Sequence, residues 1–145
     1  MERALTLARQ AAEVGEVPVG AVLVKNGLII AEASNEKERL ADATRHAEII
    51  CIQKACQNLN TWRLFDCDLY VTLEPCIMCA GAISLHRMRH VYFGATDPKG
   101  GALESLYQVG EDSRLNHRFS SSSGHLGQEC SEVLTSFFRQ LRRSK

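Results

Sequence analysis

Segments with helical and strand periodicity alternate along almost the whole 145-residue sequence, after an initial pair of strands joined by a tight turn. Apolar residues at helical spacing predict a first helix over residues 2–14, which Gly15 ends. Asn26-Gly27 is a strong hairpin signal, so we expect a buried strand over 19–24 and a returning strand over 28–31. Because helices and strands then alternate, we predict an α/β fold with helices on both faces of one mixed sheet.

The rest of the chain continues this alternation. The predicted elements are a polar loop over 35–45, a helix from His46 to about Leu59, a strand over 69–73, a helix from Pro75 to about His86, a strand over 90–94 and a final amphipathic helix from Cys130 to about Arg142. Residues 96–127 are rich in Gly, Ser, Asp and Asn, and we expect only a short helix near Leu103–Tyr107. The run Ser120–Gly124 is expected to be a solvated loop. No repeat or linker divides the sequence, so a single domain over residues 1–145 is predicted.

Composition limits the class of protein. A hydrophobic content of 45% with 23% charged residues is ordinary for a soluble globular protein. The N-terminus lacks an apolar segment typical of a secretory signal, and no apolar run approaches the roughly 20 residues of a membrane span. We therefore expect a cytoplasmic protein with no membrane partner. In a reducing compartment, metal binding by a Cys-x-x-Cys pair is favoured over disulfides, and the other four cysteines are expected to be small core residues: Cys51, Cys56, Cys67 and Cys130.

Two short runs contain the groups that a metal enzyme needs. The first is His46-Ala47-Glu48, and the second is Pro75-Cys76-Ile77-Met78-Cys79. One His and two Cys supply three ligands, and catalytic zinc sites use three protein ligands and leave the fourth position for water. Both runs stand at predicted helix N-termini, where the helix dipole lowers the pKa of a cysteine. Glu48 is then free to move protons to and from that water.

Simpler explanations of these motifs remain open. Cys-x-x-Cys alone is also found in structural zinc knuckles and in redox pairs. A structural site needs a fourth ligand, and none of the remaining histidines has a paired ligand spacing: His86, His90, His117 and His125. A His/Cys/Cys set without a redox task favours zinc over iron.

Longer runs around these motifs resemble the bacterial tRNA-specific adenosine deaminase family. The similar runs are Glu16–Val22, His46–Ile49, Thr72–Ala82, Phe93–Asp97, Leu115–Arg118 and Phe137–Arg139. The resemblance implies the cytidine-deaminase-like fold, which is a three-layer α/β/α sandwich, and a homodimer with one zinc ion per subunit. It also implies hydrolytic deamination of the wobble adenosine, position 34 of an arginine tRNA anticodon, to inosine.

The same resemblance implies roles for individual residues. His46, Cys76 and Cys79 would bind zinc, and Glu48 would be the proton shuttle for water attacking C6. Val19 and Asn35 would line the base pocket, and Asp97 would contact the neighbouring nucleotide; otherwise Val19 is strand core, and Asn35 and Asp97 are turn residues.

The net charge of the chain is zero, so a broad non-specific nucleic-acid surface is not expected, and a local one must carry any RNA contact. Five basic residues could meet RNA phosphates: Lys99, Arg118, Arg139, Arg142 and Arg143. The alternative for the C-terminal cluster is a solvated helix end.

Two departures from the family concern contacts away from the metal motif. The chain starts almost at its first helix, so its N-terminus is shorter than is usual in the family, and the Ser-rich stretch Phe119–Gly127 matches the family poorly.

Two other functions stay open. One is a free-base or nucleoside deaminase acting on guanine or cytidine, which would share both zinc motifs. The other is a zinc-dependent RNA-binding subunit without chemistry, which would have no need of Glu48.

Overall fold

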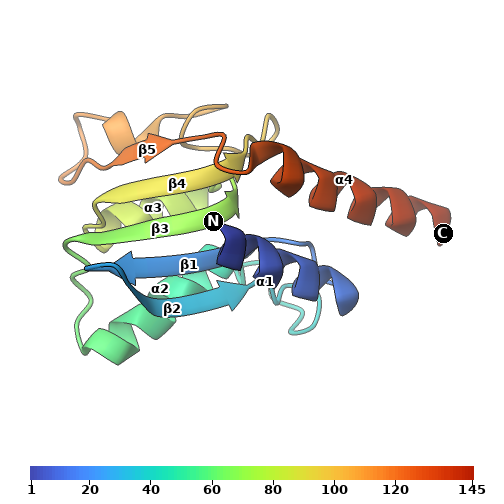
Figure 1. The fold of residues 1–145 in the computed structure, drawn as a ribbon. Helices are drawn as coiled ribbons and strands as arrows, with labels where there is room; N and C mark the ends of the chain where they lie inside the picture. The colour runs from blue at the N-terminus through green and yellow to red at the C-terminus, as the bar shows by residue number, and fades with distance from the viewer.

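A computed structural model describes all of residues 1–145 and contains one five-stranded sheet with helices on both faces (Figure 1). The strands are β1 (Gly20–Lys25), β2 (Leu28–Ser34), β3 (Cys67–Leu73), β4 (His90–Ala95) and β5 (Ser120–Ser122). They lie in the order β2-β1-β3-β4-β5. β1 is antiparallel to β2 and β3, whereas β3, β4 and β5 run parallel. The predicted mixed sheet is therefore confirmed.

The helices form one layer on each side of this sheet. Their bounds are α1 (Glu2–Glu13), α2 (Ala47–Leu59), α3 (Ile77–Leu85) and α4 (Gly127–Arg143). α1 and α4 cover one face, and α2 and α3 cover the other (Figure 1). The expected three-layer α/β/α arrangement is confirmed. No helix combines the length and the apolar composition needed to cross a membrane.

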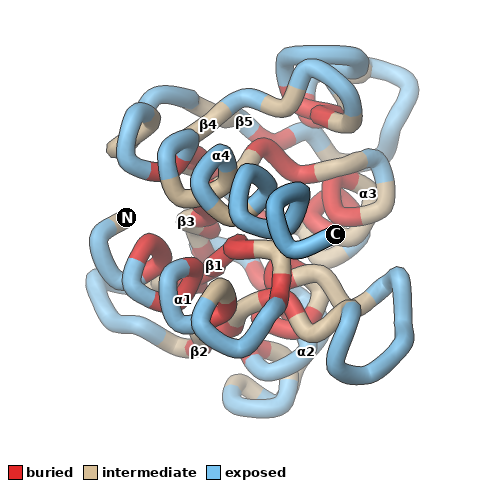
Figure 2. Tube along the Cα trace, turned by 90° about the vertical axis from the view of Figure 1, so that its right-hand side faces the viewer, coloured by how far each residue is buried: buried red, intermediate tan, exposed pale blue.

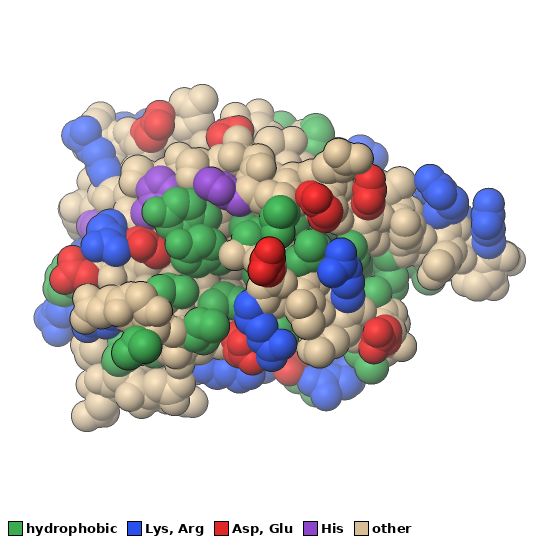
Figure 3. Space-filling model, in the orientation of Figure 1, with side chains coloured by type: hydrophobic (Ala, Val, Ile, Leu, Met, Phe, Trp, Pro, Cys, Tyr) green, Lys and Arg blue, Asp and Glu red, His purple; other side chains and the backbone are tan.

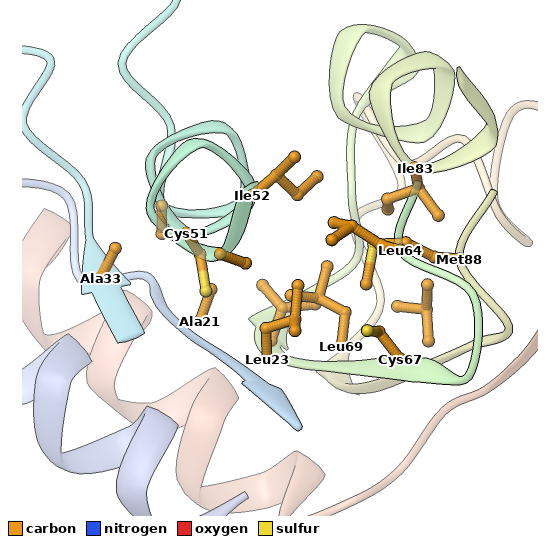
Figure 4. Close-up of a cluster of buried hydrophobic side chains, with 14 of the residues drawn as sticks. Ala21, Leu23, Ala33, Cys51, Ile52, Leu64, Cys67, Leu69, Ile83 and Met88 are labelled. Atoms are coloured by element: carbon orange, nitrogen blue, oxygen red, sulfur yellow. The ribbon is translucent and has the colours of Figure 1, made fainter. Parts of the chain in front are cut away.

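The two sides of the sheet are packed unequally. The main core of 22 buried residues lies between the sheet and the α2/α3 layer, with Leu23, Ile52, Leu69 and Ile83 among its fully buried members (Figure 4). On the other side only a cluster of three buried residues forms between α1 and the sheet. α4 has a single buried residue and is exposed along most of its length (Figure 2). This helix therefore presents most of its side chains to solvent.

Cysteines outside the Cys-x-x-Cys pair behave as predicted. Cys51, Cys67 and Cys130 are buried, Cys56 packs against the main core, and none forms a disulfide. Burial raises the pKa of the Cys51 thiol to about 12 and that of Cys130 to about 11. These thiols are therefore neutral packing groups.

Two glycines let the helices of the thinner side approach the sheet closely. A Cβ atom at Gly20 of β1 would overlap the carbonyl of Ala4 in α1. A Cβ atom at Gly94 of β4 would overlap the side chain of Cys130 in α4. Larger residues at either position would push a helix off the sheet.

Several predicted boundaries change in the structure. Ser120–Ser122 is not a solvated loop but forms edge strand β5, paired with His90–Tyr92 of β4. The helix predicted near Leu103–Tyr107 is absent, because the backbone N–H groups of residues 103–105 donate to the Glu74 carboxylate instead of to helical carbonyls. A single 3-10 turn follows, at Val109–Glu111.

Four further boundaries moved by a few residues. α3 starts at Ile77, so Pro75 lies just outside it. β2 runs on to Ser34, β3 already begins at Cys67, and α4 begins at Gly127.

Candidate active site

The three predicted metal ligands meet where two helices begin. His46 is the N-cap residue of α2, Cys76 is the N-cap residue of α3, and Cys79 lies in the first turn of α3. The Nδ1 atom of His46 lies 3.6 Å from the Sγ atom of Cys76 and 3.6 Å from that of Cys79. All three ligand atoms fall within 4.8 Å of one another. His46 and Cys76 are 30 residues apart in the sequence, yet the two motifs form one cluster that could hold a metal ion.

The geometry of the cluster can be compared with that of a tetrahedral zinc site. Zinc binds sulfur at about 2.3 Å and imidazole nitrogen at about 2.0–2.1 Å, so a tetrahedral angle separates sulfur from nitrogen by about 3.6 Å. The two observed Nδ1–Sγ distances have this value. The ligand set and its spacing thus fit a zinc ion held through Nδ1 of His46.

Electrostatics at the cluster favour the thiolate form of one ligand. A hydrogen bond from Cys79 and the neighbouring His46 ring lower the pKa of Cys76 to about 4, although partial burial acts in the opposite direction. The hydrogen bond with Cys76 likewise raises the pKa of His46. Thiolates bind metals, whereas thiols do not, so Cys76 is prepared for coordination.

Glu48 lies in the first turn of α2, two residues after His46, and is buried. Burial is the main cause that raises its pKa, while a hydrogen bond with Cys79 and the charge of His46 act to lower it. A carboxyl group in such surroundings gains and releases protons more readily near neutral pH than an exposed one. Glu48 lies beside the possible metal ligands but is not a member of their group.

A cavity of about 430 Å³ opens beside the cluster. This volume lies within the range of about 300–1,000 Å³ typical of small-molecule sites. Its walls include His46, Glu48 and Cys76, together with all three residues that the sequence suggested for the nucleotide: Val19, Asn35 and Asp97. The cavity lies at the edge of the sheet where β1 starts and where β3 and β4 end, because Val19, Leu73 and Thr96 are among its lining residues.

Asn35 joins the cavity wall to the start of α2. Its Oδ1 accepts a hydrogen bond of 2.8 Å from the N–H of Ala47, and the residue is buried. This contact leaves the NH₂ group of Asn35 available to a ligand in the cavity. Val19, just before β1, is also buried and accepts the N–H of Asn35 through its carbonyl, so the two residues hold each other in place.

Sequence reasoning missed several residues of the wall. They are Val17, Lys37, Leu73, Glu74, Thr96, Leu134 and Phe138. Leu134 and Phe138 come from α4, whose amphipathic pattern predicts a helix without saying which residues face the cavity. Glu74 and Thr96 flank predicted strands, where polar residues ordinarily indicate turns.

Only two of the five basic residues join the cavity region. Lys99 and Arg142 line a groove with Leu134, Thr135 and Phe138, and this groove adjoins the cavity through Leu134 and Phe138.

The other three basic residues lie elsewhere on this chain. Arg139 and Arg143 are exposed on α4, whose last turn projects beyond the body of the molecule (Figure 3). Arg118 lines a separate depression with Arg89 and Ser120, beside the starts of β4 and β5 and thus away from the cavity.

Comparisons with known proteins agree with this geometry. The family model of MafB19-like deaminases matches residues 1–142. The tRNA-specific adenosine deaminase of Bacillus subtilis (strain 168) is 50% identical over 145 residues, which cover 100% of this chain and 90% of the relative. The chain therefore belongs to the MafB19-like deaminase family.

Solved structures support the same placement. A structure from a study of A-to-I editing by tRNA:A34 deaminases at the wobble position is 50% identical, with a TM-score of 0.89, and the match covers 92% of this chain and 97% of that one. A guanine deaminase from Bacillus subtilis is 38% identical, with a TM-score of 0.64, over 72% of this chain and 78% of that one. The chain thus matches the tRNA deaminase structure more completely than this guanine deaminase.

Proposed function

We propose that this chain deaminates the wobble adenosine, position 34, of tRNA to inosine, with an arginine tRNA as substrate. One observation carries the proposal: the cavity lined by His46, Glu48 and Cys76 adjoins a groove lined by Lys99 and Arg142. Cys79 completes the group of possible metal ligands with His46 and Cys76. The cavity has room for a base, and the groove has the charge to meet a phosphate. Single-stranded loops such as an anticodon offer bases that can be splayed into such a pocket.

The metal in this proposal is one zinc ion per chain, held by His46, Cys76 and Cys79. When bound in such a site, zinc lowers the pKa of a water ligand from about 15.7 to about 7. The three protein ligands leave one tetrahedral position for that water.

Glu48 moves the protons of the reaction. Its carboxylate accepts a proton from the attacking water and delivers it to the ring nitrogen next to C6. The water oxygen forms a bond to C6, and the bond between C6 and the exocyclic nitrogen breaks. Glu48 then takes the remaining proton from the new C6 hydroxyl and gives it to the departing amino nitrogen, which leaves as ammonia, and a carbonyl remains at C6. General acid–base assistance of this kind contributes about 10²–10⁴-fold to the rate.

The surrounding wall holds the nucleotide. Val19 provides an apolar surface at the base, and the NH₂ group of Asn35 offers a hydrogen-bond donor to a ring nitrogen. Asp97, which also lines the cavity, would contact the adjacent nucleotide. Arg142 and Lys99 would then meet phosphates in the groove.

The main rival function is deamination of a free base or nucleoside, because a guanine deaminase is among the similar solved structures. Such a substrate would not need the groove beside α4. Purified protein should be given an arginine-tRNA anticodon stem-loop with adenosine at the wobble position, and guanine and cytidine in parallel. We expect inosine in the stem-loop only, abolished by a chelator and restored by zinc. Ammonia from guanine or cytidine with unchanged RNA would overturn the tRNA assignment.

We further propose that the chain is a single-domain, cytoplasmic enzyme that acts as a homodimer. Three apolar side chains lie exposed around one depression beside α3, namely Ile77, Tyr107 and Leu115. An exposed apolar patch of this kind is typical of a protein–protein interface. Light scattering should give twice the chain mass, and Leu115→Glu should shift the mass toward that of one chain; a monomeric parent protein would contradict the dimer.

A further inference from the structure

Glu74 has a buried carboxylate with no basic partner. It lies between the turn at Pro75-Cys76, here called the metal-binding turn, and the loop over residues 97–105. Glu74 is almost fully buried, with 2% of its surface exposed. Its Oε1 accepts hydrogen bonds from the N–H of Asp97 at 3.0 Å and from the hydroxyl of Ser105 at 2.5 Å. Its Oε2 accepts the N–H groups of Leu103 at 3.2 Å, Glu104 at 2.9 Å and Ser105 at 3.0 Å. Five donors from one loop therefore converge on a single side chain.

This arrangement makes the carboxylate the organising centre of the loop. Successive backbone N–H groups that point inward form a binding site for an anion, and here the anion is supplied by the chain itself. Hydrogen bonds to an ionised acceptor are stronger than those between neutral groups. No other acceptor in the structure replaces Glu74 for these N–H groups, so the loop conformation depends on it.

The same residue is tied to the metal ligands. Glu74 directly precedes Pro75-Cys76, and its own N–H donates to the carbonyl of Ala95 in β4 at 2.9 Å. The carbonyl of Pro75 accepts the N–H of Ala102 at 2.8 Å, and Cys76 forms an antiparallel bridge with Gly101. A Cβ atom at Gly101 would overlap the Glu74 carboxylate, so carboxylate and loop backbone are in direct contact. The metal-binding turn and the loop therefore form one unit.

The loop carries residues that face the substrate. Asp97 lines the catalytic cavity, and Lys99 lines the adjoining groove. The carboxylate of Asp97 in turn accepts the N–H of Lys99 at 3.1 Å, so the position of one affects the other.

We propose that Glu74 is a positioning residue for the RNA substrate: it fixes the 97–105 loop against the Cys76 turn and thereby sets where Asp97 and Lys99 stand relative to the reacting base. The proposal rests on the proposed function for its substrate. It differs from a purely structural role, because a structural role would affect stability and zinc content but would leave substrate affinity unchanged.

The test compares Glu74→Gln and Ser105→Ala with the parent protein. Glu74→Gln keeps the size of the side chain but turns an NH₂ group toward backbone donors, whereas Ser105→Ala removes one donor from an exposed residue. Amide hydrogen exchange by NMR, zinc content, and KM and kcat on the anticodon stem-loop should be measured. We expect the amides of residues 97 and 103–105 to exchange at least tenfold faster in Glu74→Gln. KM should rise at least fivefold in Glu74→Gln and by less in Ser105→Ala, with one zinc per chain retained in both and kcat reduced less than KM is raised.

Glu16→Gln provides a matched control. Glu16 is also a buried carboxylate without a basic partner, and it accepts the N–H groups of Glu38 and Arg39 in a different loop. Its substitution should speed exchange at residues 38–39 and leave residues 97–105 unchanged.

Two results would overturn the role of Glu74: unchanged exchange over 97–105 in Glu74→Gln, or an unchanged KM in the zinc-loaded Ser105→Ala variant. If Glu74→Gln fails to fold, Ser105→Ala decides the question by the same two measurements. Failure of the proposed function would be seen separately, as a zinc-loaded parent protein that makes no inosine, and the exchange comparison would still decide whether Glu74 holds the loop.

Discussion

Truncation of Phe138 tests whether α4 forms part of the RNA site. Phe138 lines both the catalytic cavity and the adjoining groove, and 38% of its surface is exposed. An aromatic ring in this position can stack on an RNA base, an interaction worth about 1–3 kcal/mol per base. Since each 1.36 kcal/mol changes a rate tenfold, Phe138→Ala should lower kcat/KM on the stem-loop by about 5- to 160-fold.

Phe137→Ala is the matched control for this change. Phe137 lies next to Phe138, with the two rings 5.4 Å apart, but it lines a groove beside α1 rather than the cavity. Single-turnover inosine formation should therefore fall far less in Phe137→Ala. Because Phe138 is partly exposed, its truncation should destabilise the fold by less than the roughly 3–5 kcal/mol of a buried Phe. Equal activity losses in the two variants, or none in Phe138→Ala, would refute the stacking role.

Three further predictions follow from contacts elsewhere in the structure. Arg142→Glu should weaken stem-loop binding and reduce its salt dependence by about 0.7 in log–log slope for each lost phosphate contact. Arg63→Glu should do neither, because Arg63 precedes β3 and does not line the groove, and equal effects of the two changes would exclude a local contact. The hydrogen bond from Arg45 lowers the pKa of the Glu36 carboxyl below its ordinary value, so this ion pair stabilises the fold above the ordinary pKa and the stabilisation is lost as the pH falls. Glu36→Gln should therefore lower the melting temperature at pH 7 but not in acid, and an equal loss of melting temperature at low pH would count against the ion pair. Gly94→Val should lower the free energy of unfolding, measured with denaturant, by about 1–3 kcal/mol, because the new side chain would overlap α4. Gly81→Ala, which has open space around it, should not lower it, and an unchanged free energy of unfolding in Gly94→Val would disprove the close packing.

Much of the fold could be predicted because local patterns agree with the final packing. The Asn26-Gly27 turn, the apolar strands and the two helices whose N-cap residues are His46 and Cys76 lie within a few residues of where the sequence pattern predicts them. Strand β5 could not be predicted, because serine has little preference for strands. Its place depends on β4, where His90 hydrogen-bonds to the hydroxyls of Ser120 and Ser122.

The metal cluster could be predicted because its chemistry is contained in two short motifs, but the cavity wall could not. Which residues of α4 face the cavity depends on how the helix lies on the sheet, and Gly94 sets that contact. The missing helix near residue 103 has a similar cause, since a remote carboxylate, Glu74, takes the N–H groups that a helix would use. Basic residues such as Arg118 could be recognised as charges, but only the fold shows that Arg118 lies away from the cavity on its own chain.

Inosine formation by the parent protein and by Glu48→Gln tests the central claim most directly. Both proteins should be loaded with zinc, and their affinities for the anticodon stem-loop should be measured. The rates of inosine formation on that stem-loop should then be compared under single-turnover conditions. The account predicts inosine at the wobble position with the parent protein and a rate at least about 10²-fold lower with Glu48→Gln, at equal zinc content and equal binding. An unchanged rate in Glu48→Gln would remove this carboxylate from the chemistry, and no inosine with the parent protein would contradict the assigned reaction.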